Sequence, residues 1–290
     1  MHVVCIYRNN MHFILVDGSY YTFYRYFAMT NWWSLAKPDE ELGTPIENED
    51  FVEKFKSTFI SKFKEIEKKL KLKERVIKIV ARDCPRQDIW RMNLFDTYKE
   101  CRDKDDGFLG GPFFKLAYNA GQYEDTSRQS LFHEAGAQTV IMHPHLEADD
   151  CIAITTKHII EKYPDARVWI IASDMDYLQL ASDRVSIYNL KYKDITTSKN
   201  ATGDAECDKF CKIVCGDKSD DIPGVFKKCG PKTALKYYND KELFESKLDK
   251  EEGARERYNR NKKLVDFDCI PSNYKYEFET EVLGLNGGVY

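Results

Sequence analysis

Aspartates follow three short apolar runs that are spaced along the first two thirds of the chain. These runs and their aspartates are Phe13–Val16 with Asp17, Val76–Ala81 with Asp83, and Val168–Ala172 with Asp174 and Asp176. Short apolar runs of this kind are typical of buried parallel strands. An open parallel sheet binds its ligands at the carboxyl ends of its strands. We therefore expect these four carboxylates to lie at one edge of a sheet.

Two further acidic motifs, LEADD and GDKSDD, add carboxylates to this expected edge. They supply Glu147, Asp149 and Asp150, and then Asp217, Asp220 and Asp221. Two carboxylates about 4 Å apart repel by roughly 4 kcal/mol at an effective dielectric of 20. So many ionised groups require cations between them, and hard oxygen ligands select Mg²⁺ or Mn²⁺. Two such ions suit phosphodiester hydrolysis, because they activate a water molecule and clamp the scissile phosphate. The sequence predicts a metal-dependent enzyme.

Each acidic motif also has a plainer explanation. A lone aspartate after a strand is often a helix N-cap, and acidic residues at a helix start complement the helix dipole. The metal hypothesis depends on five separate segments that direct carboxylates to one edge. The chain has no P-loop lysine motif, no GxSxG elbow and no HExxH motif that would favour another mechanism.

Composition is that of a globular protein with reduced thiols. The 290 residues are 42% hydrophobic and carry a net charge of −4. Lysines nevertheless concentrate at Lys54–Lys78 and Lys227–Lys236. These local basic patches could bind phosphate groups despite the negative net charge. No signal peptide or membrane span is recognisable, which predicts a cytoplasmic protein. Cys207, Cys211 and Cys215 recur every four residues, which indicates either a zinc or redox cluster or, as we favour, a buried helical stripe.

The elements expected to position these residues alternate between helix and strand, which predicts an α/β fold. The expected helices are Ser19–Leu35, Phe51–Leu72, Ile89–Cys101, Tyr123–Glu134, Glu147–Tyr163 and Tyr177–Leu180. Further strands are expected at Gln138–Met142 and Val185–Tyr188. From Asp204 onward the pattern is helical, with a turn-rich insertion at Asp217–Lys232.

These motifs, in this order, resemble the 5′-nuclease superfamily of flap endonucleases, and within it the T-even phage 5′-exonucleases. The resemblance covers about residues 12 to 272 and includes LVDGSYYTFYRYF, ARDCPRQDIWRMNLFDTYKECR, LEADD, ASDMDYLQL, GDKSDDIPGV and YNRNKKLVDFDCIP. It implies a PIN-like α/β fold, with a mostly parallel central sheet flanked by helices and a helical C-terminal part that carries a helix–turn–helix. The implied domains are a nuclease core at 1–203, with a helical arch at about 88–135, and a DNA-binding region at 204–290, with the helix–turn–helix at about 213–240.

The resemblance also implies roles for individual residues. Two Mg²⁺ ions, which Mn²⁺ can replace, would be held by Asp17, Asp83, Glu147, Asp149 and Asp150 in a first group and by Asp174, Asp176, Asp217 and Asp220 in a second. Lys99, Arg102 and Arg91 would hold the scissile phosphate at the base of the arch. Tyr98 would stack on a base near the cut, a contact typically worth about 1–3 kcal/mol. Without the resemblance, a solvated helix face would be the favoured interpretation of the segment from Arg91 to Arg102.

The helix–turn–helix would bind duplex DNA through backbone amides, lysines and a monovalent cation, K⁺. Its candidate residues are Lys227, Lys228, Gly230, Lys232 and Lys236. Such contacts to phosphates read no base sequence. The sequence departs from the superfamily pattern here, because Lys228-Cys229-Gly230 stands where a Gly-Ile/Val-Gly turn is usual. The arch segment, with Gly107, Gly110 and Gly111 and few basic residues, is also atypical.

We expect a structure-specific 5′-nuclease, acting as a 5′→3′ exonuclease or flap endonuclease that removes RNA primers or flaps during replication. Its expected partners are flap, nicked or 5′-overhang duplex DNA and RNA/DNA hybrid, bound by a monomer in the cytoplasm, or in the host cytoplasm if the source is viral. GLNGGVY at the end of the chain contains no clamp-binding motif. The alternatives are a PIN-like single-strand ribonuclease and a non-catalytic DNA-binding scaffold.

Overall fold

A five-stranded parallel sheet forms the centre of the protein. The structure is a computed structural model that describes residues 11–103 and 107–284, so residues 285–290 of GLNGGVY and the part of the predicted arch at 104–106 lie outside it. The strand order is β3-β2-β1-β4-β5. The strands are β1 (His12–Asp17), β2 (Val76–Ala81), β3 (Thr139–Ile141), β4 (Arg167–Ile171) and β5 (Val185–Tyr188). The predicted α/β class with a mostly parallel sheet is confirmed.

The apolar runs become the central strands because both faces of the sheet are covered. Phe13, Leu15 and Ile170 lie in one core, whereas Ile14 and Val16 lie in the other, as the alternation of side chains along a strand requires. The parallel register pairs the last residue of β1, Asp17, with the last residue of β2. The residues that follow β1, β2 and β4 therefore emerge at the same edge.

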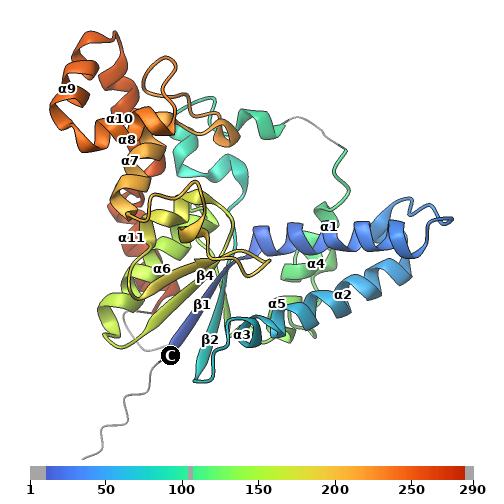
Figure 1. The fold of residues 1–290 in the computed structure, drawn as a ribbon. Helices are drawn as coiled ribbons and strands as arrows, with labels where there is room; N and C mark the ends of the chain where they lie inside the picture. The colour runs from blue at the N-terminus through green and yellow to red at the C-terminus, as the bar shows by residue number, and fades with distance from the viewer. Residues whose placement is uncertain (1–10, 104–106, 285–290) are drawn as a thin grey trace, which may run out of the picture.

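Helices cover the two faces of the sheet (Figure 1). One face carries α1 (Gly18–Ala36), α2 (Glu49–Lys64), α3 (Ile66–Lys69), α4 (Gly111–Tyr118) and α5 (Leu131–Glu134), and the other carries α6 (Ala148–Lys162) and α11 (Ser272–Glu277). An aromatic stripe of Phe51, Phe55, Phe59 and Phe63, spaced four residues apart, is buried along α2. The helix expected over Phe51–Leu72 is interrupted at Glu65 and continues as α3.

The prediction of a helix over Ile89–Cys101 is wrong. The chain there forms short 3₁₀ turns, among them η3 (Trp90–Asn93) and η4 (Glu100–Asp103). Its backbone bonds to other segments instead of to itself: the amide of Trp90 donates to His145, and that of Lys99 donates to Asp220, at 3.2 and 3.0 Å. These tertiary hydrogen bonds replace the intrahelical ones and account for the error.

Two other predicted helices are also shorter or of another type. The helix expected over Tyr123–Glu134 is reduced to α5, because the Asn119 side chain binds the backbone of Asp125 and Arg128 and closes a loop ahead of it. The helix expected over Tyr177–Leu180 is a 3₁₀ helix, η6 (Met175–Leu180).

Four C-terminal helices lie beyond the carboxyl edge of the sheet, at the upper left of Figure 1. They are α7 (Ala205–Cys215), α8 (Pro231–Asn239), α9 (Lys241–Lys250) and α10 (Ala254–Val265). After α10 the chain returns to the sheet, where Phe267, Ile270, Phe278 and Leu283 join the core beneath α6. The boundary predicted at residue 203 stays a prediction, and residues on both of its sides share one core.

Cysteine side chains on α7 form the predicted stripe. Cys207 is buried, and burial raises the pKa of Cys211 to about 12 and that of Cys215 to about 11, so these thiols stay protonated at neutral pH. The groups of potential metal ligands within the described ranges are acidic, and none of them includes a cysteine. Across those same ranges, no helix has the length and apolarity needed to cross a bilayer.

Candidate metal centre

The carboxyl edge of the sheet gathers the carboxylates of several segments. Asp17 ends β1 and caps α1: its two oxygens accept hydrogen bonds from the Tyr20 amide at 2.9 Å and the Tyr177 hydroxyl at 3.0 Å. Asp83 follows β2 and accepts from the Ala148 amide, at the start of α6, at 2.8 Å. Hydrogen bonds to these two aspartates therefore join β1, β2, α6 and η6 at this edge.

Three carboxylates at this edge lack a positive partner. Asp17, Asp83 and Asp149 form no ion pair with any residue that the structure describes. Burial, together with the nearby charge of Asp83, raises the pKa of Asp17 to about 7. Burial and the neighbouring Asp150 and Glu147 raise the pKa of Asp149 well above its ordinary value. Among the described residues, these three carboxylates at the edge are therefore not balanced by an ion pair.

The other two members of the first predicted group are already neutralised. Arg91 binds Glu147 at 2.9 Å and Asp150 at 2.7 Å, and the Lys99 ammonium also binds Glu147. Trp90 donates its indole N–H to Asp150 at 2.9 Å. Glu147, Asp149 and Asp150 place carboxylate oxygens within 4.8 Å of one another. They differ in their ion pairs, because Glu147 and Asp150 each bind a cationic side chain and Asp149 does not. Asp149 is the member that forms no ion pair with a described residue.

A second acidic group lies where the C-terminal helices meet η6. Carboxylate oxygens of Asp176, Asp217 and Asp220 lie within 4.8 Å of one another. Lys212 of α7 binds Asp176 at 2.8 Å and Asp217 at 2.5 Å. It also lies 3.9 Å from Asp174, which is exposed. The structure thus brings together all four residues of the second predicted group.

Sequence reasoning missed Lys212. It lies between two cysteines of the α7 stripe, and no local pattern distinguishes it from a solvated lysine. Its contacts span 36 residues back to Asp176 and five forward to Asp217. The nearby carboxylates raise the pKa of Lys212 above its ordinary value, although burial opposes the shift. Its ammonium supplies positive charge at the position where the resemblance implies a second ion.

Both acidic groups fit divalent cations by the chemistry of their donors. They offer only carboxylate oxygens, the ligands that Mg²⁺ and Mn²⁺ prefer. Burial of Asp17 and Asp149 without a positive partner is unfavourable when both are ionised. A cation at this edge would remove that penalty.

The residues predicted to hold the scissile phosphate are engaged within the protein. Arg91 is 1% exposed and Lys99 is 8% exposed. Arg102 is exposed and binds Asp220. Tyr98 is 2% exposed, and its hydroxyl donates to Glu147 at 3.0 Å, so it offers no open ring face to a base. The roles predicted for Arg91, Tyr98, Lys99 and Arg102 remain predictions.

The predicted DNA-binding lysines form an exposed set at and beside α8. Lys227, Lys228, Lys232 and Lys236 are all exposed, and none makes an ion pair with a described residue. Helices α7 and α8 flank the 216–230 segment, as a helix–turn–helix would require. Gly216 has φ +73°, and an added Cβ there would lie 2.3 Å from the Ile222 carbonyl oxygen. Lys228 has φ +58°, a conformation that favours glycine, so the turn keeps its shape without one.

Comparisons with known proteins match this fold and these motifs. Residues 12–209 match the family described as 5′-3′ exonuclease, N-terminal resolvase-like domain. A 5′-3′ exonuclease of Buchnera aphidicola is 27% identical over 230 residues, which are 77% of this chain and 68% of that protein. A 5′-3′ exonuclease of Halalkalibacterium halodurans is 34% identical over 194 residues, which are 64% of this chain and 59% of that protein.

Solved structures with the same fold include the T5 D15 protein co-crystallised with metal ions. It superposes with a TM-score of 0.63 at 19% identity, over 95% of this chain and 100% of that one. A T5 D15 flap endonuclease in a pseudo-enzyme–product complex with DNA and metal ions superposes with a TM-score of 0.62 at 18% identity. The match covers 94% of this chain and 98% of that one. At these identities the likeness establishes the fold alone.

Proposed function

The chain belongs to the 5′-3′ exonuclease family with an N-terminal resolvase-like domain, and from this premise we propose that it is a structure-specific 5′-nuclease. Its proposed substrates are flap, nicked or 5′-overhang duplex DNA and RNA/DNA hybrid, and its proposed role is removal of primers or flaps during replication. The observation that carries the proposal is the set of three half-buried carboxylates, Asp17, Asp83 and Asp149, that form no ion pair with a described residue at the carboxyl edge of a parallel sheet.

Mg²⁺ is the cofactor we propose, with Mn²⁺ as a substitute. Asp17, Asp83 and Asp149 would hold one ion, and Asp174, Asp176, Asp217 and Asp220 would hold a second. When bound, such ions lower the pKa of the attacking water and neutralise charge that develops on the scissile phosphate. The hydrogen bonds from Tyr20 and Tyr177 fix the Asp17 carboxylate, so that its oxygens are oriented before any ion arrives.

Arg102 is the arch-base cation best placed to receive a phosphate. Its side chain is about half exposed, whereas Lys99 is held between Glu147 and Asp220, with 3.7 Å between its ammonium and the Asp220 carboxylate. An incoming phosphate would compete with Asp220 for Arg102, whose side chain is 49% exposed although that of Asp220 is 8% exposed. Lys99 and Arg91 then act through Glu147 and Asp150, by holding the start of α6 in place.

The exposed lysines at and beside α8 support binding of duplex DNA through its phosphates. A T5 flap endonuclease with this fold has been crystallised with DNA. Lysines and backbone amides bind phosphates without reading bases, which suits an enzyme that selects a junction and not a sequence. We propose a monomer, with K⁺ as the monovalent cation of the turn that precedes α8.

A cleavage assay with labelled substrates tests the proposal. The protein is incubated with a 5′-labelled flap duplex and with the matched single strand, each in Mg²⁺ and in EDTA. Cutting at the flap junction that requires Mg²⁺ is the expected result. Cutting of the single strand alone would replace the proposal with a PIN-like ribonuclease. Binding to the duplex without cutting in either Mg²⁺ or Mn²⁺ would replace it with a non-catalytic scaffold.

A further inference from the structure

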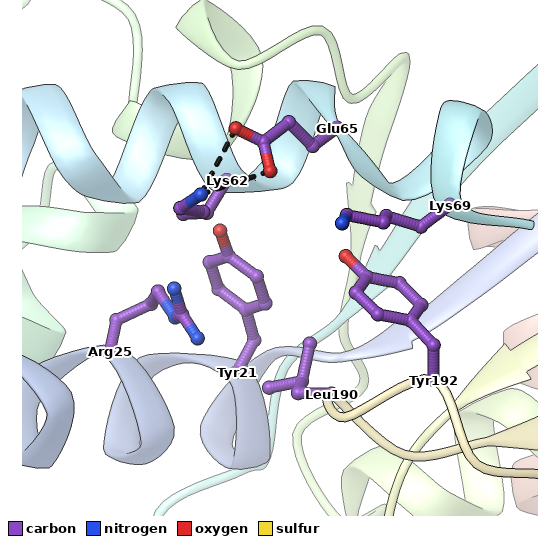
Figure 2. Close-up of a pocket in the computed structure, with 7 residues that line it drawn as sticks. All are labelled: Tyr21, Arg25, Lys62, Glu65, Lys69, Leu190 and Tyr192. Atoms are coloured by element: carbon purple, nitrogen blue, oxygen red, sulfur yellow. Dashed lines mark hydrogen bonds and ion pairs between the residues drawn. The ribbon is translucent and has the colours of Figure 1, made fainter.

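A second polar site, lined by none of the carboxylates of the acidic edge, lies beside α1 (Figure 2). It is a cavity of about 210 Å³ between α1, the end of α2 with α3, and the loop that follows β5. Three of its lining side chains are cationic, Arg25, Lys62 and Lys69, and only Glu65 is anionic. The proposed nuclease chemistry uses none of these residues.

The positive charge of this cavity is only partly neutralised. Glu65 binds Lys62 at 3.0 Å. The side chains of Arg25 and Lys69 form no hydrogen bond or ion pair with any residue in the described ranges, although each lies near an aromatic ring. The Nε–H of Arg25 is buried without an acceptor. A buried donor without a partner is unfavourable, and an anionic acceptor in the cavity would satisfy it.

The wall opposite Arg25 is a loop in a fixed conformation. Tyr192 has φ +57°, a left-handed conformation that is unfavourable for a residue other than glycine. Asn189 holds the loop: its side-chain oxygen accepts from the amides of Lys191 and Lys193, and its carbonyl accepts from Tyr192. Figure 2 shows the Tyr192 ring directed toward Lys69, across the opening from Arg25. Hydrogen bonds within the loop therefore hold this wall of the cavity.

The cavity is also connected to the acidic edge. The Tyr20 hydroxyl accepts from the Leu190 amide at 3.0 Å and so ties the wall of the cavity to α1. Asp17 caps the same helix, and Arg25 lies eight residues further along it. At 1.5 Å per residue the two are about 12 Å apart along the helix axis. That length corresponds to roughly three or four nucleotides of one strand in a duplex.

We propose that this cavity binds a phosphate group, with Arg25 and Lys69 as its principal ligands. A volume of about 210 Å³ is below the roughly 300–1,000 Å³ of sites that enclose a whole small molecule. The ligand is therefore a phosphate whose remainder, if any, extends into solvent. Guanidinium and ammonium groups are the usual partners of such an anion. The phosphate comes either from a free monoester or from the backbone of a DNA strand.

Binding measured in EDTA tests this proposal independently of cleavage. Inorganic phosphate, thymidine 5′-monophosphate and a single-stranded oligonucleotide without a terminal phosphate are titrated separately at constant ionic strength. The test variant is Arg25→Gln/Lys69→Gln. The control is Arg75→Gln/Lys64→Gln, which removes the same two charges from exposed positions outside the cavity. We expect the test variant to weaken binding about tenfold or more, as loss of charged hydrogen bonds predicts, and the control to change it less than about twofold.

The three ligands separate the two sources of phosphate. Selective weakening of inorganic phosphate and the mononucleotide identifies a monoester site, and selective weakening of the oligonucleotide identifies a backbone site. Changes in the backbone amide chemical shifts of the wild-type protein, recorded by NMR as each ligand is added, provide a second measurement that needs no variant. They should concentrate at Leu190–Tyr192 and at Lys69. Equal affinities of test and control variants for every ligand, or shifts spread over the lysine surface, would overturn the proposal.

Discussion

Arg91 binds both carboxylate oxygens of Asp150, with 2.8 and 2.7 Å between the paired atoms. The two side chains are 1% and 0% exposed. The pair joins a 3₁₀ turn to the first turn of α6 across 59 residues of sequence. Asp149, a proposed metal ligand, immediately precedes Asp150 on α6. The pair therefore fixes the position of Asp149, while the Asp150 carboxylate is itself occupied by Arg91.

Asp150→Asn should therefore damage stability. Removing one partner of a buried ion pair typically costs about 3–5 kcal/mol, because the other charge remains buried. We expect a loss of this size in the free energy of unfolding, measured by urea denaturation in EDTA. Asp149→Asn is the matched control, since Asp149 is adjacent and has no ion pair, and it should not lower stability. A loss below about 1 kcal/mol for Asp150→Asn would show that the pair is dispensable.

Asp149→Asn should abolish cleavage and leave DNA binding measurable. Its carboxylate is the member of the LEADD group that no cation neutralises. Loss of a metal ligand should reduce the cleavage rate of a flap duplex by about 100-fold or more. The dissociation constant for the same duplex, measured by fluorescence anisotropy in EDTA, should stay within about twofold, since phosphate contacts lie elsewhere. Asp39→Asn, at an exposed position, is the control, and activity of Asp149→Asn equal to that of the control would refute this assignment.

Lys212→Met should make the protein more dependent on a divalent ion. The substitution leaves Asp176 and Asp217 without their ammonium partner. We expect a lower melting temperature in EDTA and a larger rise on addition of Mg²⁺ than in the wild-type protein. A ligand at 100 times its dissociation constant stabilises the folded state by about 2.7 kcal/mol. Identical Mg²⁺-induced shifts for both proteins, measured by scanning calorimetry, would mean that Lys212 and the ion do not share a site.

Lys228→Gly should stabilise the turn before α8. Lys228 has φ +58°, which costs a residue with a Cβ about 1–2 kcal/mol, and the greater chain entropy of unfolded glycine returns part of this gain. We expect a net increase of about 1 kcal/mol in the free energy of unfolding. Lys228→Ala removes the same charge but keeps the Cβ, so it should show no increase. Equal stability of the two variants would indicate that the backbone conformation differs from that described.

Lys232→Gln/Lys236→Gln should weaken DNA binding equally for unrelated sequences. Both side chains are exposed on α8. If each contacts one phosphate, the slope of log K against log salt should fall in magnitude by about 0.9 per lysine. Lys241→Gln, at an exposed position on α9, serves as the control with a single charge removed. A slope unchanged from the wild-type protein would place the duplex on another surface.

Sequence patterns predicted the sheet and its acidic edge because both depend on local features. Each central strand is a short apolar run, and a carboxylate that follows such a run must emerge at the carboxyl edge. The parallel register that aligns Asp17 with Ala81 then follows from the shared burial of β1 and β2. The α2 stripe was predictable for the same reason, since the spacing of its phenylalanines is itself the signal.

Which of the acidic residues form ion pairs, and which do not, could not be predicted from the sequence. Arg91 and Glu147 are 56 residues apart, and Lys99 and Glu147 are 48 apart. No local pattern shows that these cations fold onto LEADD, so Asp149 and Asp150 are equivalent in sequence although they differ in the structure. The same long-range contacts replaced the helix expected over Ile89–Cys101 with 3₁₀ turns.

The return of the chain to the sheet after α10 has a consequence for its synthesis. Phe267, Ile270, Phe278 and Leu283 fill the core beneath α6, next to strands formed by the first residues that the structure describes. This layer can be completed only when residue 283 has emerged from the ribosome, after β1, β2 and β4 have been synthesised. Until then α6 can pack against β1, β2 and β4 but not against the C-terminal segment, so this core lacks some of its apolar side chains.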